Sequence, residues 1–408
     1  MRLAVVSPFV DRRHGTERAL AELLERLAGQ HHCEIHLYAQ RVEGLALAQP
    51  GVPLSQQSGS ILWRKVPSVP GPHLLQFIAW LFLNSFCRAW DRWAHGLRFD
   101  LVLSPGINCL DADVVIVHAL FHCLRDLGLA RDLASARPAL FRSLHLRAYY
   151  GLLTGLERRI YSDPKVLLAA VSQRTAALLA DYFHRQDVRV IPNGVDTAQF
   201  SPPARLALRD EARRRRSFQE TDFVLLLIGN DWRVKGLGTV LRAVSALREL
   251  PIVVLAAGDD SPDSFRETAR SLGILERCRF EPSRQDVLDF YAAADLYVSP
   301  SLEDSFGLPV AEAMACGLPP ITSIFAGVSS LLHDGVDSFI LRDPHDAKTL
   351  TTMIRTLYEK VEWRSRMGQA AARASLEWTW DRNAADIWDL LKDAVARNAP
   401  PSARQRLS

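Results

Sequence analysis

Short apolar runs alternate with amphipathic, helix-length stretches along this chain, and the whole alternation occurs twice. Parallel strands need long crossover connections, so the alternation predicts two α/β domains, each with a parallel sheet covered by helices. In the front half the predicted strands are Leu3–Ser7, Glu34–Tyr38, Leu101–Ser104, Val114–His118, Val166–Val171 and Val188–Ile191. In the back half they are Phe223–Ile228, Ile252–Ala256, Arg279–Glu281, Leu296–Val298, Pro320–Thr322 and Ser338–Leu341.

The segment from Ile191 to Pro203 is the predicted domain boundary, because turn formers and prolines interrupt both periodicities there. We predict a first domain over residues 1–195 and a second over residues 196–375. A final helix over 376–398 is amphipathic and should return to the first domain, and residues 399–408 should form a disordered tail. The arginine-rich run Arg205–Arg216 is interpreted as a solvated helix beside the linker.

Composition excludes several classes of protein. The net charge of +3 over 408 residues excludes a strongly basic nucleic-acid-binding protein. The six cysteines show neither a C-x-x-C pair nor a zinc spacing, which favours a reduced, cytoplasmic setting over a disulfide framework. The first apolar run is too short for a signal peptide, so we interpret it as a buried strand.

The segment Ser301–Gly317 carries the strongest functional signal. Asp304 and Glu312 lie eight positions apart across a Gly307-Leu308-Pro turn that should open a helix. The exposed N–H groups of a helix start bind phosphate, and carboxylates accept hydrogen bonds from hydroxyls. The segment therefore predicts a site for a ligand that carries phosphate and hydroxyls together, as a nucleotide-sugar does.

This segment resembles the acid-x7-Glu motif of the retaining glycosyltransferases of family four. Pro192-Asn-Gly-Val-Asp196, Lys235-Gly236 and Ala294-Asp295 follow the family's order, so the resemblance covers nearly the whole chain. It implies the α/β GT-B fold, with two Rossmann-like domains facing each other across a cleft. It also implies transfer of a hexose from a nucleotide diphosphate sugar, such as a UDP-sugar or GDP-mannose, to a saccharide or lipid-linked acceptor. Polysaccharide or lipopolysaccharide biosynthesis is the implied setting.

The resemblance assigns roles to the residues of the motif. Glu312 should accept hydrogen bonds from the ribose, and Asp304 should meet hydroxyls of the transferred hexose. Gly307 and Leu308 should offer N–H groups to the phosphate, with Phe306 beside them. Family members carry glutamate at the first acidic position, whereas this chain has Glu303 followed by Asp304, so either carboxylate is a candidate.

Cations follow the first strand of the second domain. Gly229 is followed by Arg233 and Lys235, and a fixed cation there would stabilise the charge that develops on a departing diphosphate. Lys235 is the first candidate, and Arg233 is the second because Asn230 replaces the family's arginine. The alternative is that both are surface cations.

Two further loops are predicted to receive the nucleobase. Gly258 matches the family's glycine-acid turn, and Arg284 follows the next predicted strand; Arg284 could equally be exposed to solvent. Tyr291 and the segment after it belong to the same predicted base site.

In the first domain, Gly15 follows a strand and precedes a helix, at the edge of the sheet where ligands bind, although a full G-x-G-x-x-G pattern is absent. His118 ends a strand at the same edge. The resemblance implies that His118 faces the donor sugar; a satisfied core histidine is the alternative, and His122 competes for the role.

No metal or other cofactor is expected. Asp111-Ala-Asp113 resembles a D-x-D metal motif, but it precedes a strand and so lies at the wrong edge of the sheet. Residues 60–99 combine eight aromatic residues with five cations and one aspartate. This region is either a crossover helix packed on the sheet or a peripheral contact with an anionic membrane surface.

Three other functions remain open on the sequence alone. A sugar-nucleotide epimerase of the same fold would act without an acceptor. A phosphorylase would need phosphate or a pyridoxal lysine, and a non-catalytic nucleotide-sugar-binding protein would show no turnover. The nucleobase and hexose of the donor, the acceptor and the oligomeric state stay undetermined.

Overall fold

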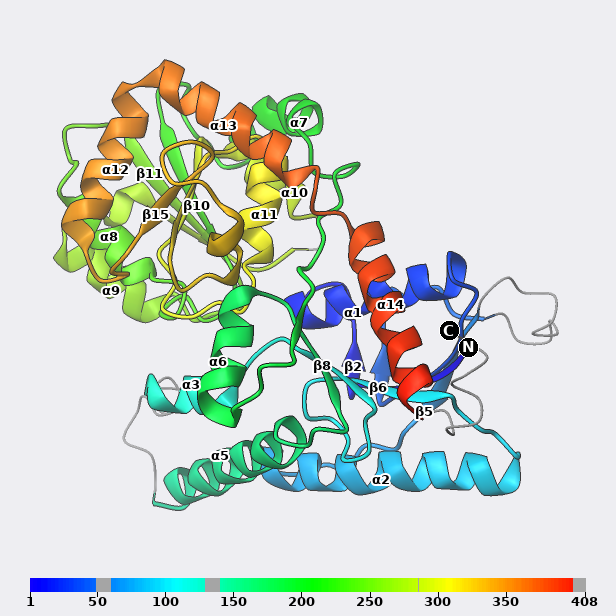
Figure 1. Cartoon of the computed structure of the whole chain (residues 1–408). Helices are drawn as coiled ribbons and strands as arrows, with labels where there is room; N and C mark the ends of the chain where they lie inside the picture. Colours follow the sequence, from blue (N-terminus) through cyan, green and yellow to red (C-terminus); the bar gives the residue numbers. More distant parts are fainter. Residues whose placement is uncertain (49–59, 129–139, 285, 399–408) are drawn as a thin grey trace. The chain divides into compact units, whose positions relative to one another are not determined.

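The computed structural model describes residues 1–48, 60–128, 140–284 and 286–398. It divides into two compact units (Figure 1): Met1–Ile191 with the C-terminal segment from Trp380, and Pro192–Thr379. These limits lie a few residues from the predicted ones, because the two connecting segments pair at the bridge between Val195 and Thr379 and so stay with the second unit. The predicted tail lies outside the described residues.

The first unit contains a parallel sheet with the order β5-β3-β1-β6-β7-β8-β9, and a small sheet that pairs β2 with β4. Successive residues of β1 and β7 are buried, so both faces of this sheet are covered. Sequence patterns did not predict β2, β4 or β5. The strands are β1 (Arg2–Val6), β2 (Phe9–Val10), β3 (Glu34–Ala39), β4 (Arg41–Val42), β5 (Ser60–Lys65), β6 (Leu101–Pro105), β7 (Val114–Val117), β8 (Leu167–Ala170) and β9 (Arg189–Val190).

The helices of the first unit are α1 (Gly15–Gly29), α2 (His73–Ala94), α3 (Phe121–Asp126), α5 (Leu140–Tyr161), α6 (Gln173–Phe183) and α14 (Trp380–Asn398). The last helix, α14, packs against α1, and Asp381 accepts a 2.7 Å ion-paired hydrogen bond from Arg26. The amphipathic face noted in the sequence therefore has a partner within this unit.

Helix α2 has two different faces. One face is buried through Trp80, Asn84, Arg88 and Asp91, and Asp91 accepts a hydrogen bond from the Tyr38 hydroxyl on β3. The other face exposes large aromatic side chains. Along the described part of the chain, α2 included, no helix combines the length and apolar content needed to cross a bilayer.

The second unit contains a six-stranded parallel sheet with the order β12-β11-β10-β13-β14-β15. Its strands are β10 (Phe223–Ile228), β11 (Ile252–Ala257), β12 (Cys278–Glu281), β13 (Leu296–Ser299), β14 (Pro320–Ser323) and β15 (Phe339–Leu341). Its α-helices are α7 (Pro202–Arg215), α8 (Leu237–Ser245), α9 (Asp263–Ser271), α10 (Leu288–Ala293), α11 (Leu308–Ala315), α12 (Ala347–Glu359) and α13 (Val361–Ser375), with short 3-10 turns at Leu275–Arg277 and Gly327–Leu331. Strand β10 pairs with β11 on one side and with β13 on the other. The chain therefore adds strands first on one side of β10 and then on the other, so the strand order reverses at β10.

The interpretation of Arg205–Arg216 as a solvated helix was wrong. Helix α7 packs along α10, and Arg213 and Arg216 are each only 8% exposed. Their charges are buried because acidic residues of the second unit meet them: Arg213 approaches Asp295, and Arg216 lies 2.7 Å from Asp289.

Candidate functional site

The carboxyl ends of β10 and β13 bring two predicted site residues together. Lys235 follows β10 and Asp304 follows β13, and the Lys235 ammonium donates a 2.6 Å hydrogen bond to Asp304 Oδ2. Ligands of open parallel sheets bind where the strand order reverses, which is the position of this pair. The side chains are 17% and 15% exposed, so the pair is accessible from solvent without being fully solvated.

Glycines allow these loops to approach each other closely. Gly236 has φ +81°, and a Cβ atom there would lie 2.2 Å from the carbonyl oxygen of Pro300. A Cβ atom on Gly258 would lie 2.1 Å from the carbonyl oxygen of Gly229. Neither distance is possible in a protein, so the glycines predicted at these turns are needed to bring the three loops together.

Asp304 is held more firmly than its position on a loop suggests. Its backbone N–H donates to the Phe325 carbonyl, and its own carbonyl accepts from the Gly327 N–H. Asp304, rather than Glu303, is thus the carboxylate that pairs with Lys235, while Glu303 is partly exposed beside it.

Helix α11 begins directly after this segment, with Gly307 at its N-cap in a left-handed conformation. The Phe306 and Leu308 side chains are buried, so the backbone N–H groups are what this turn offers to a ligand. The prediction that Phe306 belongs to the donor site therefore concerns its backbone; its ring packs in the interior.

Glu312 lies on α11 and is 4% exposed. The hydroxyl of Tyr291, on α10, donates a 2.6 Å hydrogen bond to Glu312 Oε2. Burial, followed by the nearby Glu312 carboxylate, raises the pKa of Tyr291 well above its usual value, so the phenol keeps its proton and acts as a donor. Sequence analysis placed Tyr291 near the base and did not pair it with Glu312.

The loops after β10, β11 and β12 are tied together. The Asn230 side chain, at the family's arginine position, accepts a hydrogen bond from the Asp259 N–H. The Asp259 carboxylate in turn accepts a 2.6 Å hydrogen bond from the Ser283 hydroxyl. Arg233 lies on the first of these loops with a partly exposed side chain.

Arg284 lies apart from the Lys235–Asp304 pair in the sheet order. It follows the edge strand β12, which β11 separates from β10. Its side chain is 46% exposed and pairs with Glu281 at 3.1 Å. The structure thus gives Arg284 a partner at the end of β12, the strand that precedes it.

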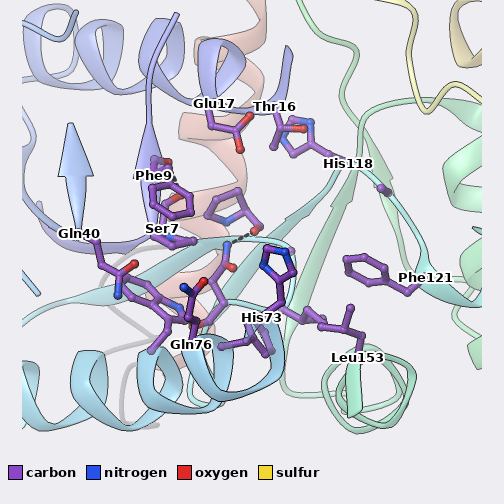
Figure 2. Close-up of a pocket in the computed structure, with 18 of the residues that line it drawn as sticks. Ser7, Phe9, Thr16, Glu17, Gln40, His73, Gln76, His118, Phe121 and Leu153 are labelled. Carbon is purple, nitrogen blue, oxygen red and sulfur yellow. Dashed lines mark hydrogen bonds between the residues drawn. The ribbon is translucent and has the colours of Figure 1, made fainter. Parts of the chain in front are cut away.

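The first unit contains a pocket of about 410 Å³ at the carboxyl edge of its sheet (Figure 2). Thr16 and Glu17, from the start of α1, and His118, directly after β7, lie together at one side of it. Gly15 is the first residue of α1 and is exposed. Sequence analysis predicted His118 here and missed Glu17, although Glu17 lies two positions after the predicted Gly15.

Burial changes the titration of both groups. It lowers the pKa of His118 to about 4, so the imidazole is neutral at pH 7 and one ring nitrogen can accept a hydrogen bond. It raises the pKa of Glu17. The pocket therefore disfavours charge and suits a ligand that is uncharged where it meets these two side chains.

His122 is a core residue rather than a second candidate. It is 4% exposed, and its Nδ1 atom lies 2.6 Å from the Glu157 carboxylate. Glu157 also accepts hydrogen bonds from the Phe121 and His122 N–H groups at the start of α3. His118 is the one of the two histidines that lines the pocket.

The D-x-D residues have internal partners. Arg88 donates two 2.7 Å hydrogen bonds to Asp111, and Asp113 accepts from the Val102 N–H. No group of three or more His, Cys, Asp or Glu side chains arranged to hold a metal ion occurs among the residues that the structure describes.

Two family models match this chain, one on each unit. The Glycosyltransferase Family 4 model matches residues 13–199, and the Glycosyl transferases group 1 model matches residues 209–374. The chain belongs to glycosyltransferase family four.

Related proteins agree with this assignment. D-inositol 3-phosphate glycosyltransferase of Salinispora arenicola is 32% identical over 58% of this chain and 56% of its own length. The chain thus spans little more than half the length of the curated relatives that it matches.

Two solved structures share the fold. WaaG, a glycosyltransferase involved in lipopolysaccharide biosynthesis, aligns with a TM-score of 0.73 at 20% identity, over 94% of this chain and 99% of its own. Anabaena Alr3699/HepE, crystallised with UDP and glucose, aligns with a TM-score of 0.67 at 19% identity, over 96% and 99%. The prediction of a GT-B fold with two parallel-sheet domains is confirmed.

Proposed function

We propose that this protein transfers a hexose from a nucleotide diphosphate sugar to an acceptor hydroxyl, with retention at the anomeric carbon and without a metal ion. The observation that carries the proposal is the contact between Lys235 and Asp304 at the reversal of strand order, beside the first turn of α11. A cation and free helix N–H groups suit a diphosphate, and carboxylates suit sugar hydroxyls. HepE, which shares the fold, was crystallised with both parts of such a donor.

The site supplies positive charge where the leaving group needs it. The bond between the anomeric carbon and the phosphate oxygen breaks, and the diphosphate gains negative charge that Lys235 and the N–H groups near Gly307 stabilise. The acceptor oxygen attacks from the same face, and its proton passes to the departing phosphate oxygen. Asp304 and Glu312 already accept hydrogen bonds from Lys235 and Tyr291, which fits carboxylates that bind hydroxyls rather than a covalent nucleophile.

The acceptor site is the pocket of the first unit. Its volume of about 410 Å³ fits one or two sugar rings. Aromatic side chains such as Phe9 and Tyr149 line it together with Gln76 and Asn108, and this mixture of rings and amides suits a saccharide. Glu17 and the neutral His118 would then hydrogen-bond sugar hydroxyls at its edge.

A donor panel tests the function. UDP-, GDP- and ADP-sugars are each added to the full-length chain, with EDTA or with Mg²⁺, and the melting temperature is recorded. Only the true donor should raise it, by an amount that grows with concentration and does not need Mg²⁺. The anomeric configuration of the product, read by NMR from its coupling constant, should match that of the donor.

Other results of the panel would contradict the proposal in specific ways. Free sugar released from the donor at full rate without any acceptor would indicate an epimerase. Binding without turnover would indicate a sensor, and a shift that EDTA removes would require a metal. An inverted product would exclude same-face attack.

We also propose that the exposed face of α2 contacts an anionic membrane surface from the cytoplasmic side. Phe82, Phe86, Trp90 and Trp93 follow one another at helical spacing and are 50–78% exposed. The ring centres of Phe86 and Trp90 lie 6.4 Å apart, and those of Trp90 and Trp93 lie 5.2 Å apart, so the three rings form one continuous aromatic surface. Arg92 is exposed on the same helix. Aromatic bulk flanked by cations is typical of interfacial helices, and a membrane contact would place a lipid-linked acceptor within reach.

Vesicle sedimentation tests this contact. The wild-type chain should bind phosphatidylglycerol-containing vesicles and lose most binding in high salt, while Phe86→Ser/Trp90→Ser should bind at least about tenfold more weakly, because two large apolar side chains leave the interface. Leu376→Ser, which removes an equally exposed apolar residue from the second unit, is the matched control and should bind normally. Equal binding by both variants would exclude α2 as the contact surface.

A further inference from the structure

A second cavity of about 410 Å³ lies in the second unit, at the opposite edge of its sheet from the Lys235–Asp304 pair. Asp295 and Pro319, which precede β13 and β14, line it at the amino ends of those strands. Helices α7 and α13 form its other walls. Nothing in the proposed transfer reaction uses this cavity.

The cavity is strongly basic. Arg205, Arg209 and Arg364 line it, with Asp295 as the acidic residue among the lining side chains. The Asp295 carboxylate already has two cationic partners. It accepts a 2.6 Å hydrogen bond from Arg209, and it lies 3.4 Å from Arg213, which does not line the cavity. The lining therefore carries positive charge in excess.

Arg205 has an unusual environment. Its Nε atom is buried without a hydrogen-bond partner, and its Nη1 atom donates only a 3.2 Å bond to the Ala294 carbonyl. Burial, together with the charge of Arg209, lowers its pKa. A buried guanidinium N–H group without an acceptor lowers the stability of the folded protein, because the desolvation of the donor is not compensated.

Arg364, on α13, adds a second guanidinium without a carboxylate. It donates to the Leu357 and Tyr358 carbonyls and stacks on the Phe223 ring, and burial lowers its pKa. Within the described residues, neither Arg205 nor Arg364 forms an ion pair. Both are thus available for an anion.

The cavity is built into the packing of the unit. Gly317 follows α11 and Gly368 lies within α13, and a Cβ atom on Gly368 would be 2.4 Å from the Gly317 carbonyl oxygen. This close contact fixes α13 against the loop that precedes β14. A Cβ atom on Gly317 would lie 3.2 Å from Pro202 Cγ at the start of α7, so α7 packs on the same loop. The arginines on α7 and α13 are consequently carried by two helices that both contact this loop.

We propose that this cavity binds a small phosphate ester, with its phosphate on Arg205 and Arg364. Arginine guanidinium groups bind phosphate oxygens through paired, charge-assisted hydrogen bonds, and the terminal guanidinium nitrogens of both arginines can make them here. Leu206 and Val361, each 57% exposed at the rim, would cover the carbon part of the ester. The site is separate from the donor site, and the proposal stands whether or not the chain transfers sugar.

Calorimetry of the full-length chain with glycerol 3-phosphate tests the proposal, with glycerol and inorganic phosphate as comparisons. The ester should bind, inorganic phosphate should bind more weakly, and glycerol should not bind. Arg205→Gln should lower the affinity for the ester at least about tenfold, because one charged hydrogen-bond donor is lost. Arg205→Gln should melt no lower than wild type without ligand, since the change removes a buried Nε–H group that has no hydrogen-bond acceptor.

Two controls separate this site from others. Lys235→Ala should leave ester binding unchanged, and equal loss in that variant would mean that the ester binds at the donor site instead. Arg214→Gln removes an exposed arginine from the same helix and should also have no effect. Leu206→Glu, an exposed substitution that adds a carboxylate at the rim, should weaken binding without affecting folding. Absence of ester binding by the wild type, or full binding by both Arg205→Gln and Leu206→Glu, would overturn the proposal.

Discussion

Lys235→Ala should lower the rate of sugar transfer by about 10²- to 10³-fold, the usual cost of removing one preorganised group that stabilises charge in a transition state. Lys235 is held at the reversal of strand order by a 2.6 Å bond to Asp304, and its aliphatic chain runs beside Gly229. The ammonium is therefore positioned before the donor arrives. Initial rates of donor consumption, measured at saturating donor, give the effect directly.

The loss should appear in kcat as well as in kcat/KM, because charge on the diphosphate is greater in the transition state than in the bound donor. Lys348→Ala, which removes an exposed lysine on α12, should leave both constants unchanged. A Lys235→Ala enzyme with more than about a tenth of the wild-type kcat would mean that another group carries the leaving-group charge.

Sequence reasoning placed Lys235 and Asp304 near each other because both residues follow strands. Apolar runs such as Phe223–Ile228 and Leu296–Val298 fix where strands end, and Lys235 and Asp304 follow those ends. Parallel strands bring their carboxyl ends to one edge, so proximity along that edge can be read from the chain. Which of Glu303 and Asp304 faces Lys235 could not be read, because the answer depends on contacts of Asp304 with the distant Phe325 and Gly327.

Tertiary partners account for the other differences. The hydrogen bond from Tyr291 to Glu312 joins two helices, and neither helix pattern contains a sign of it. Strand β5 escaped detection because it is an edge strand whose residues alternate between partly exposed and exposed after its first two positions. Such a strand is short and only half apolar, so its pattern is weak.

Helix α7 illustrates the same limit for charge. A run as rich in arginine as Arg205–Arg216 is typical of a solvated surface helix, and its low mean hydropathy indicates the same. The buried counterions come from α10 and the residue before β13, more than seventy positions away in sequence. Only the fold shows that these arginines connect the helix to the domain.

Asp289→Ala should therefore destabilise the second unit by about 1–3 kcal/mol, because Arg216 loses one of its two buried carboxylate partners and keeps the other, Glu281. The Asp289 and Arg216 side chains are each 4% exposed and lie 2.7 Å apart, and Arg215 donates a 3.0 Å bond to the same carboxylate. Urea denaturation of the full chain, followed by tryptophan fluorescence, measures the change in the free energy of unfolding.

A double variant distinguishes the loss of ion pairing from the loss of packing. Arg216 also pairs with Glu281 at 2.8 Å, but Glu281 retains Arg284 when Arg216 is replaced. Asp289→Leu/Arg216→Met should therefore recover much of the stability that Asp289→Ala loses, because two apolar side chains can replace a buried pair at little cost. Asp210→Ala, at an exposed position on α7, should change the free energy of unfolding by less than about 0.5 kcal/mol. If Asp289→Ala were as mild as Asp210→Ala, the contact between α7 and α10 would depend on apolar packing, and the buried charges would contribute little to it.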